Sequence, residues 1–322
     1  MSQNSALIPV IIDTDPGIDD AMAIHYASAH PAIELVGLTT VFGNVFVEQA
    51  TRNALFLKEQ TLDNFDVVEG AGTPLEMPPN PPSHYVHGDE GLGDMPAPQV
   101  SLSADSRDTS QYIYDICASR PNEVVLCPVG PLTNIARLVR EKPDIVSLVK
   151  RVVIMGGAVW ADGNVTPHAE ANIWNDPHAA DIVFSADWEI DLIGLDVTQK
   201  ITCTKADFDR IAASAPEIGG FLAEISEFYI KFYHSVQNRY VCVMHDPTAL
   251  VAITDRELFS FKKAPLSVTL SGEKIGKSYA DAPSGRREIN VCVDANIDAV
   301  RKRFLDICSQ ADTIKAGRKL SG

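Results

Sequence analysis

The chain has 322 residues, 45% of them hydrophobic, and no visible linker, so we expect one large domain over residues 1–322. A formal net charge of −16 argues against a nucleic-acid partner, because phosphate backbones are bound by clustered Lys and Arg. No apolar run reaches membrane-spanning length, so no membrane partner is expected, and a small-molecule partner or a cation fits better.

Short apolar runs alternate with helical patterns along the first two thirds of the chain. The runs are apolar throughout, as in parallel strands that are covered on both faces. We predict strands over 8–13, 34–41, 123–128, 151–156 and 190–196, with helices over 19–30, 47–60, 108–119, 132–141 and 176–186. This order predicts an α/β fold with a central, mostly parallel sheet flanked by helices.

The last third of the chain is more mixed. Apolar residues recur every three or four positions over 205–236, which predicts a helical region. Strand-like segments follow at 264–270 and 287–294, and a helix is expected at 296–309. Earlier in the chain, the long proline-rich loop at 77–94 is of the kind that often forms a functional lid.

Four aspartates follow the first predicted strand within eight positions: Asp13, Asp15, Asp19 and Asp20. In parallel α/β sheets, ligands bind beyond the carboxyl ends of the strands. The N-terminus of the next helix stabilises one or two carboxylates by about 0.3–1 kcal/mol each, which leaves the others unexplained. A divalent cation explains them, and oxygen-only ligands suit Ca²⁺ or Mg²⁺. We expect Asp15 and Asp20 to bind the metal and Asp13 to make a hydrogen bond in the turn.

The same segment allows a second interpretation. Asp13-x-Asp15 begins the D-x-D-x-T motif of phosphatases that form an aspartyl-phosphate, but Gly17 stands where the threonine hydroxyl is needed. The chain also has no G-x-x-x-x-G-K-[ST] or G-x-G-x-x-G element to hold phosphates. A metal-dependent phosphatase is therefore disfavoured.

The six cysteines contain no C-x-x-C pair, and most lie in apolar runs such as VVLCPV. Reduced, buried thiols in a cytoplasmic protein account for them best. The N-terminal segment MSQNSALIPV lacks the basic and apolar regions of a signal peptide, so we expect none.

Further polar clusters follow the other predicted strands. They are TTVFGN, PVGPLTNIA, VIMGGA, the stretch AEANIWNDPHAA, GLDVT and HDP. Together with DTDPGIDD, these motifs resemble the nucleoside hydrolases, the family of inosine–uridine-preferring and pyrimidine-specific ribonucleoside hydrolases. The resemblance runs from about residue 9 to the C-terminus and implies the Rossmann-like fold of that family.

The resemblance implies hydrolysis of the N-glycosidic bond of ribonucleosides with a tightly bound Ca²⁺. It assigns the ion to Asp15, Asp20, Asp246 and the backbone carbonyl of Val129, with a Ca²⁺-bound water as nucleophile. Asp15 would be the general base that takes the proton of this water. His245, which can be protonated near neutral pH, would donate to the departing base.

The resemblance also implies a ribose site and a base site. Ribose contacts fall to Asp19, Asn44, Asn164, Glu170 and Asn172. Met155 either packs on the sugar or simply fills the core, and His87 of the 77–94 loop would close over the site. Tyr229, Tyr233 and Gln237 are candidates for the base. Uridine and cytidine are slightly favoured over inosine, because no tryptophan in this helix or loop is available to sandwich a purine.

Two further expectations concern assembly and catalysis. Relatives of this kind imply a homodimer or homotetramer. A non-catalytic nucleoside-binding protein on the same fold is the alternative to an enzyme, because a fold alone does not fix function. The presence of Asp15, Asp20, Asp246 and His245 argues against that alternative, since a pure binding protein needs neither a base nor an acid.

Overall fold

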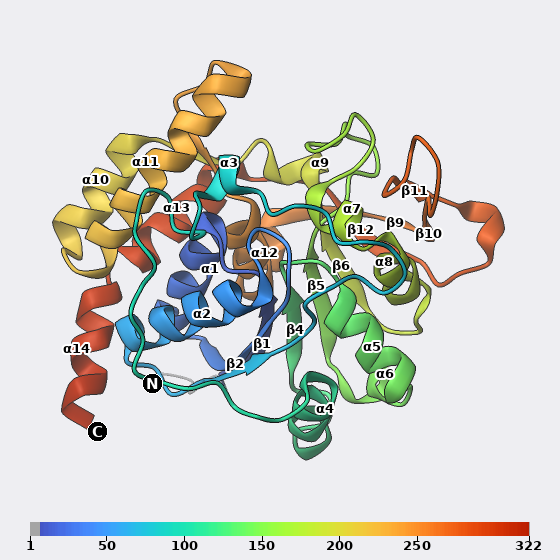
Figure 1. Cartoon of the computed structure of the whole chain (residues 1–322), viewed down its shortest axis with the longest axis horizontal. Coiled ribbons are helices and arrows are strands. Elements are labelled where there is room, and N and C mark those ends of the chain that lie inside the picture. The colour runs from blue at the N-terminus through green and yellow to red at the C-terminus, as the bar shows by residue number, and fades with distance from the viewer. Residues whose placement is uncertain (1–6, 322) are drawn as a thin grey trace.

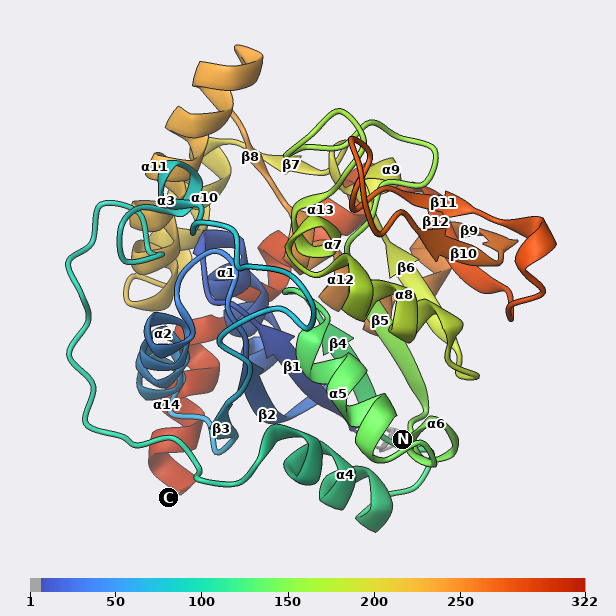
Figure 2. The same cartoon turned by 45° about the vertical axis from the view of Figure 1, so that its right-hand side comes forward.

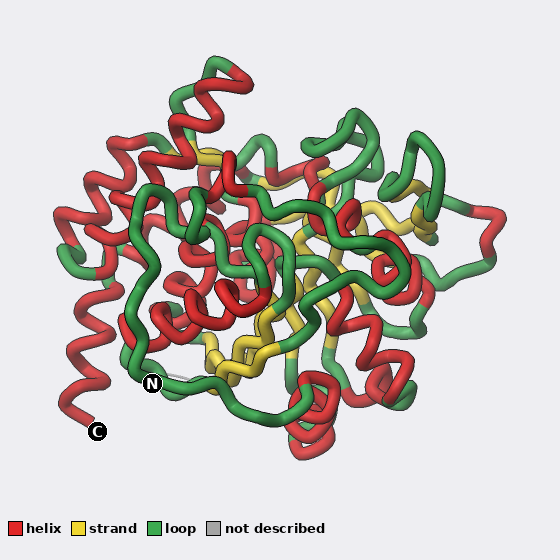
Figure 3. The backbone as a smooth tube through the Cα atoms, in the orientation of Figure 1, coloured by secondary structure: helices red, strands yellow, loops and turns green. Residues whose placement is uncertain are grey.

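The computed structural model describes residues 7–321 of the expected single domain. Residues 1–6 and 322 lie outside the described part, as does most of the segment in which a signal peptide was sought. A central sheet has the strand order β3-β2-β1-β4-β5-β6-β12-β9 (Figures 1 and 3). Its strands are β1 (Ile8–Thr14), β2 (Ile33–Thr40), β3 (Asp66–Glu69), β4 (Val125–Pro128), β5 (Arg151–Met155), β6 (Ile190–Ile193), β9 (Phe259–Ala264) and β12 (Ile289–Ala295). Only β9 is antiparallel to its neighbour in this sheet, which confirms the predicted α/β architecture.

Helices cover both faces of the sheet (Figure 2). Val10 and Ile12 of β1 belong to one apolar cluster, while Ile11 between them belongs to the other. The first cluster includes residues of α1 (Ile18–Ala29), α2 (Val47–Thr61), α10 (Lys205–Ser214), α11 (Ile218–Gln237), α12 (His245–Thr254) and α13 (Ile297–Cys308). The second includes residues of α4 (Thr109–Ser119), α5 (Thr133–Glu141), α6 (Ile145–Leu148) and α8 (Pro177–Ser185). Burial on both faces explains why the parallel strands read as continuous apolar runs.

The shorter elements are α3 (His84–His87), α7 (Ala171–Asn175), α9 (Leu195–Thr198) and the two pairs β7 (Thr202–Cys203) with β8 (Cys242–Val243) and β10 (Leu266–Val268) with β11 (Ser278–Ala280). Two 3₁₀ turns, Arg256–Leu258 and Ala282–Ser284, and the C-terminal helix α14 (Ala311–Ser321) complete the described chain. In Figure 3 a long loop runs along the outside of the molecule from α3 to α4. No helix in residues 7–321 is long and apolar enough to cross a bilayer.

Three boundary predictions are corrected. The helical region 205–236 is two helices, α10 and α11, because Pro216 disfavours helical geometry at Ala215. The run 264–270 splits at Pro265 between β9 and β10. The run 190–196 ends as a strand at Ile193 and continues into the short helix α9.

The order of the strands determines where a site can form. β1 lies between β2 and β4, so the chain leaves it towards one side and returns on the other. In open α/β sheets, ligands bind outside the carboxyl ends of the strands at such a switch point. The carboxyl end of β1 leads directly into the aspartate-rich segment, as the sequence predicts.

Candidate active site

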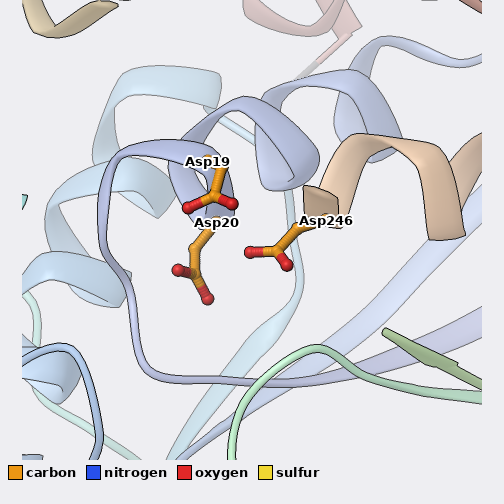
Figure 4. A group of neighbouring side chains, drawn as sticks. All are labelled: Asp19, Asp20 and Asp246. Carbon is orange, nitrogen blue, oxygen red and sulfur yellow. The ribbon is translucent and has the colours of Figure 1, made fainter. Parts of the chain in front are cut away.

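Three buried carboxylates meet at the N-termini of α1 and α12. Ligand oxygens of Asp19, Asp20 and Asp246 all lie within 4.8 Å of one another, and the side chains point towards a common space (Figure 4). Burial, followed by the neighbouring charges of Asp19 and Asp20, raises the pKa of Asp246 well above its ordinary value. Buried like charges this close are costly unless a cation offsets them.

Asp15 approaches the same cluster from the end of β1. Its Oδ2 accepts a hydrogen bond of 2.6 Å from the backbone N–H of Asn44. Its Oδ1 is buried and has no hydrogen-bond partner among the described residues. Gly130 permits this position, because a Cβ there would lie 2.6 Å from Oδ1. An unpaired, buried carboxylate oxygen is free to contact a cation or a water molecule.

Two of the four predicted metal ligands, Asp20 and Asp246, belong to this group, whereas Asp15 and Val129 do not. Asp20 and Asp246 come together as expected, and Asp19, which was assigned to the ribose, joins them in a group that could hold a metal ion. The carbonyl of Val129 lines the adjoining cavity and accepts a 2.6 Å bond from Asn172 Nδ2. The donors are carboxylate and carbonyl oxygens, which is the chemistry of a hard cation.

Asp13 lies apart from this group. Its Oδ1 accepts hydrogen bonds from Thr39 Oγ1 at 2.5 Å and from Asn134 Nδ2 at 2.7 Å. The expected bond within the turn is therefore wrong in its partners, because β2 and α5 provide the donors. Asp13 fastens β1 to these neighbouring elements.

A cavity of about 340 Å³ opens next to the carboxylates. Its lining contains every residue predicted to bind substrate: Asp19, Asn44, His87, Met155, Asn164, Glu170, Asn172, Tyr229, Tyr233 and Gln237. Val129, His245 and Asp246 also line it, whereas Asp15 and Asp20 do not. Segments far apart in sequence thus converge on one space.

Several lining residues were not predicted, among them Ser83, Tyr85, Val86, Gln199, Phe232 and Val236. Phe232 and Val236 lie three and seven positions after Tyr229, on the same face of α11, so helical periodicity could have identified them. Tyr85 lies on α3 with its ring centroid 5.9 Å from that of Phe232. No comparable sequence signal points to Ser83 or Gln199.

Glu170 caps the N-terminus of α7, and backbone N–H groups hold its carboxylate in place. Its Oε1 accepts from the backbone N–H of Asn172, and its Oε2 accepts from those of Gly157 and Ile173. The side chain is 2% exposed, and burial raises its pKa. These bonds fix the carboxylate in one orientation beside Asn164 in the cavity lining.

His245 begins α12, directly before Asp246 of the carboxylate cluster, and lines the cavity. Its Nδ1 is 2.8 Å from Thr198 Oγ1, and its Nε2 is 2.8 Å from Tyr233 Oη. Burial lowers the pKa of His245 to about 4, so the neutral imidazole predominates at pH 7. Burial thus favours a neutral donor over the protonated one that the sequence suggested, and the place of His245 in the cavity agrees with a role towards the base.

His87 is hydrogen-bonded to the metal loop, the segment of residues 15–20 that carries Asp15, Asp19 and Asp20. Its Nδ1 accepts a 3.1 Å hydrogen bond from the backbone N–H of Ile18, and its ring centroid lies 5.5 Å from that of Tyr229. Burial, and then His245, lower the pKa of His87 to about 3. The 77–94 loop thus contributes a buried neutral side chain to the cavity.

Comparison with known proteins decides the family. The model of the inosine-uridine preferring nucleoside hydrolases matches residues 10–302. The chain belongs to this family.

Relatives of this nucleoside hydrolase support the assignment along most of its length. Uridine nucleosidase 1 of Arabidopsis thaliana is 37% identical over 273 residues, 84% of this chain and 81% of the relative. The inosine-uridine preferring nucleoside hydrolase of Leishmania major is 38% identical over 266 residues, 82% and 84% of the two chains. The relatives are named as enzymes, and this nucleoside hydrolase is a ribonucleoside-hydrolysing enzyme.

Solved structures agree with this nucleoside hydrolase in fold. A plant nucleoside hydrolase superimposes with a TM-score of 0.90 at 32% identity, covering 94% of this chain and 98% of that one. The purine-preferring ribonucleoside hydrolase from Gardnerella vaginalis gives a TM-score of 0.91 at 31% identity, covering 95% and 99%. The names of these relatives include both uridine and purine nucleosides, so the family alone does not define the base.

Proposed function

We propose that this nucleoside hydrolase cleaves the N-glycosidic bond of pyrimidine ribonucleosides, uridine and cytidine, with inosine as a further substrate, and uses Ca²⁺. One observation carries the proposal: two carboxylates of the buried oxygen cluster, Asp19 and Asp246, line the same cavity as a histidine–tyrosine pair, and this cavity is large enough for a nucleoside. The first group suits the ribose and water, and the second suits the base.

The ion would be held by Asp15, Asp20, Asp246 and the carbonyl of Val129, with Asp19 beside them. The unpaired Oδ1 of Asp15 and the close approach of the other carboxylates support this set. Ca²⁺ accepts six to eight oxygen ligands in flexible geometry, which suits a site of several carboxylates and one carbonyl. When bound, the ion offsets the carboxylate charges and polarises water and the ribose hydroxyls.

Asp15 is the general base in this proposal. A water oxygen attacks C1′ of the ribose, its proton passes to Oδ1 of Asp15, and the bond between C1′ and the base nitrogen breaks. Positive charge develops on the sugar, and the buried carboxylates stabilise it more strongly in the transition state than in the ground state. The electron pair of the broken bond leaves with the base.

His245 acts on the departing base as a neutral hydrogen-bond donor. Its Nε2 faces Tyr233 in the cavity lining, where a base nitrogen could replace the tyrosine hydroxyl as partner. A preorganised donor at the point where negative charge develops lowers the barrier to bond cleavage.

The choice of base rests on the cavity wall and on the relatives. Tyr229, Phe232 and Tyr233 form an aromatic wall, with ring centroids 5.0 Å apart for the two tyrosines. No tryptophan lines the cavity in the described part of the chain. Relatives named uridine nucleosidase, at 36% and 37% identity, support pyrimidine ribonucleosides.

The proposal extends to the setting of the enzyme. All six cysteines are free and buried, which supports a reducing, cytoplasmic environment. A homodimer or homotetramer is proposed from the family resemblance.

The test is an assay of released ribose with uridine, cytidine, inosine, adenosine and deoxyuridine, with and without a calcium chelator. We expect ribose from uridine and cytidine at the highest rates and loss of activity with chelator. Deoxyuridine should react at least about 100-fold more slowly in kcat/KM, because a site built for hydroxyls leaves its own polar groups unpaired without them. Equal turnover of deoxyuridine and uridine would contradict the ribose site, and faster cleavage of inosine would reverse the base preference.

A further inference from the structure

We propose that Thr198 is a positioning residue that holds His245 in the tautomer with hydrogen on Nε2, so that the histidine donates to the departing base. The inference rests on the proposed function, since it gives the histidine its direction of donation. The two residues are 47 positions apart in sequence and meet at the ends of α9 and α12.

The contact between Thr198 and His245 is buried. Thr198 is 0% exposed and His245 is 6% exposed. The 2.8 Å contact with Nδ1 is the only hydrogen bond of the Thr198 hydroxyl among the described residues. Solvent therefore does not offer this hydroxyl an alternative partner.

The tautomer follows from counting hydrogens at this contact. If Nδ1 carried the hydrogen, it would donate to Thr198, and the threonine's own hydroxyl hydrogen would be buried without an acceptor. Buried unsatisfied donors are strongly disfavoured. The threonine hydroxyl therefore donates to Nδ1, and the ring hydrogen lies on Nε2.

The contacts of the other ring nitrogen agree with this tautomer. Tyr233 Oη lies 3.5 Å from Tyr229 Oη, which in turn lies 3.4 Å from Asp19 Oδ2. The Tyr233 oxygen in turn accepts from His245 Nε2 at 2.8 Å. With the ring hydrogen on Nε2, the hydroxyl hydrogen of Tyr233 is free to point towards Tyr229, so each hydroxyl of this row has a partner.

The backbone holds the threonine and the histidine in register. The N–H of Thr198 donates to the carbonyl of Gly194 at 3.1 Å, and the N–H of Met244 donates to the carbonyl of Ile201 at 2.9 Å. The antiparallel pair β7–β8 lies between the two segments. This frame fixes Thr198 beside Nδ1 rather than leaving the contact to side-chain rotation.

This arrangement determines which ring nitrogen of His245 donates a hydrogen bond into the cavity. A hydrogen on Nε2 presents a donor to the cavity, whereas the other tautomer would present a lone pair to a base that is gaining negative charge. A hydrogen-bond partner at the second ring nitrogen is the usual way to fix the tautomer of a functional histidine.

The experiment compares Thr198→Val, which keeps the shape but removes the hydroxyl, with Thr198→Ser, which keeps the hydroxyl. Both are assayed with uridine and with 4-nitrophenyl riboside, whose leaving group needs no hydrogen-bond donor. We expect Thr198→Val to lower kcat for uridine about 10–100-fold with KM nearly unchanged, to leave the nitrophenyl substrate within about 3-fold, and Thr198→Ser to restore most of the rate. Equal losses on both substrates, or no loss on either, would overturn the proposal.

A second measurement does not depend on activity. In protein labelled with ¹⁵N in its histidines, the His245 signals are identified by their absence in His245→Asn. We expect a protonated Nε2 and a hydrogen-bonded, unprotonated Nδ1 in the wild type, with mixed tautomers in Thr198→Val. A protonated Nδ1 in the wild type would overturn the inference even in an active enzyme. Failure of the wild type to hydrolyse any nucleoside would overturn the proposed function, while the spectrum would still decide the tautomer.

Discussion

Asp15 has one carboxylate oxygen that is bound and one that is free. Oδ2 accepts from the Asn44 N–H, and Oδ1 is buried beside Gly130 without a hydrogen-bond partner among the described residues. Asp15→Asn keeps the shape but removes the charge and the basicity. We expect kcat for uridine to fall by about 10²–10⁴-fold, the usual contribution of a general base, with a folded protein. Steady-state kinetics and thermal melting together measure this.

Asp13→Asn is the matched control, because Asp13 is equally buried and lies two residues before Asp15, but accepts from Thr39 and Asn134. Its amide cannot accept both hydrogen bonds without burying an unpaired N–H₂ group, so stability should fall by about 1–3 kcal/mol. The loss of kcat should be much smaller than for Asp15→Asn. Similar kcat losses in the two variants would show that Asp15 acts only through the fold.

Sequence reasoning reached most of the site residues because charged groups at strand ends have few structural explanations. The motif that contains Asp15 and Asp20 is one such case, and the HDP segment is another. Asp246 of the HDP segment lines the cavity and lies close to Asp20. Thr198 could not be found in this way. A single threonine after a strand has many ordinary uses, and its contact with His245 depends on the packing of α9 against α12.

At the scale of elements, Asn53 of α2 joins the metal loop to the 77–94 loop. Its Nδ2 donates to the carbonyl of Pro16 at 3.1 Å and to that of Glu90 at 2.8 Å. Asn53→Ala removes both bonds and should loosen the loop that carries His87. We expect KM for uridine to rise about 3–30-fold, in line with the loss of one or two hydrogen bonds, with faster hydrogen exchange over residues 84–93.

Gln60→Ala provides the control for the loop variant. Gln60 also lies on α2 and bonds a buried partner, His25 Nε2, at 2.9 Å, but the contact is at the far end of the helix. This change should lower stability without altering KM or exchange in the loop. If both variants raise KM equally, the effect comes from a change in α2 as a whole, and the two hydrogen bonds of Asn53 have no separate role.

The elements themselves differ in how well the sequence predicts them. The central strands were found because burial on both faces makes them continuously apolar. Edge strand β9 was missed, since Lys262 and Lys263 are exposed and interrupt the apolar pattern. The break between α10 and α11 depends on Pro216 and on Asp312 of α14, which accepts from the N–H groups of Glu217 and Ile218. Because Glu217 and Asp312 are 95 positions apart, no local sequence pattern predicts this contact.

At the scale of the whole molecule, two sets of buried groups respond to pH in opposite ways. Burial raises the pKa of Asp13 to about 7 and, together with Asp20, that of Asp19 to about 8. Burial lowers the pKa of His25 to about 4, as it does for His245. The aspartates favour folding when protonated, and the histidines favour it when neutral. Between pH 4 and 6.5 the two trends oppose each other.

Above pH 6.5 the histidines are neutral in both the folded and the unfolded chain, so only the aspartates act. An aspartate with a raised pKa keeps its proton when folded and loses it when unfolded, so stability falls as the pH rises towards the folded pKa. In chelator we expect Asp19 to lose about 1 kcal/mol of stability per pH unit between pH 6.5 and 8, and Asp13 to lose less, mostly below pH 7. Both losses appear as a falling Tm.

Calcium should oppose this loss, because it binds the ionised carboxylates of the folded protein. The Tm difference between calcium and chelator is therefore expected to widen from pH 6.5 to 8. Asp246→Asn should reduce both the slope in chelator and the calcium effect, since it removes one carboxylate of the cluster. Potassium at equal ionic strength is the control. Parallel Tm curves in calcium and chelator would mean that the buried aspartates do not share a cation, and the assignment of the metal site would then be wrong.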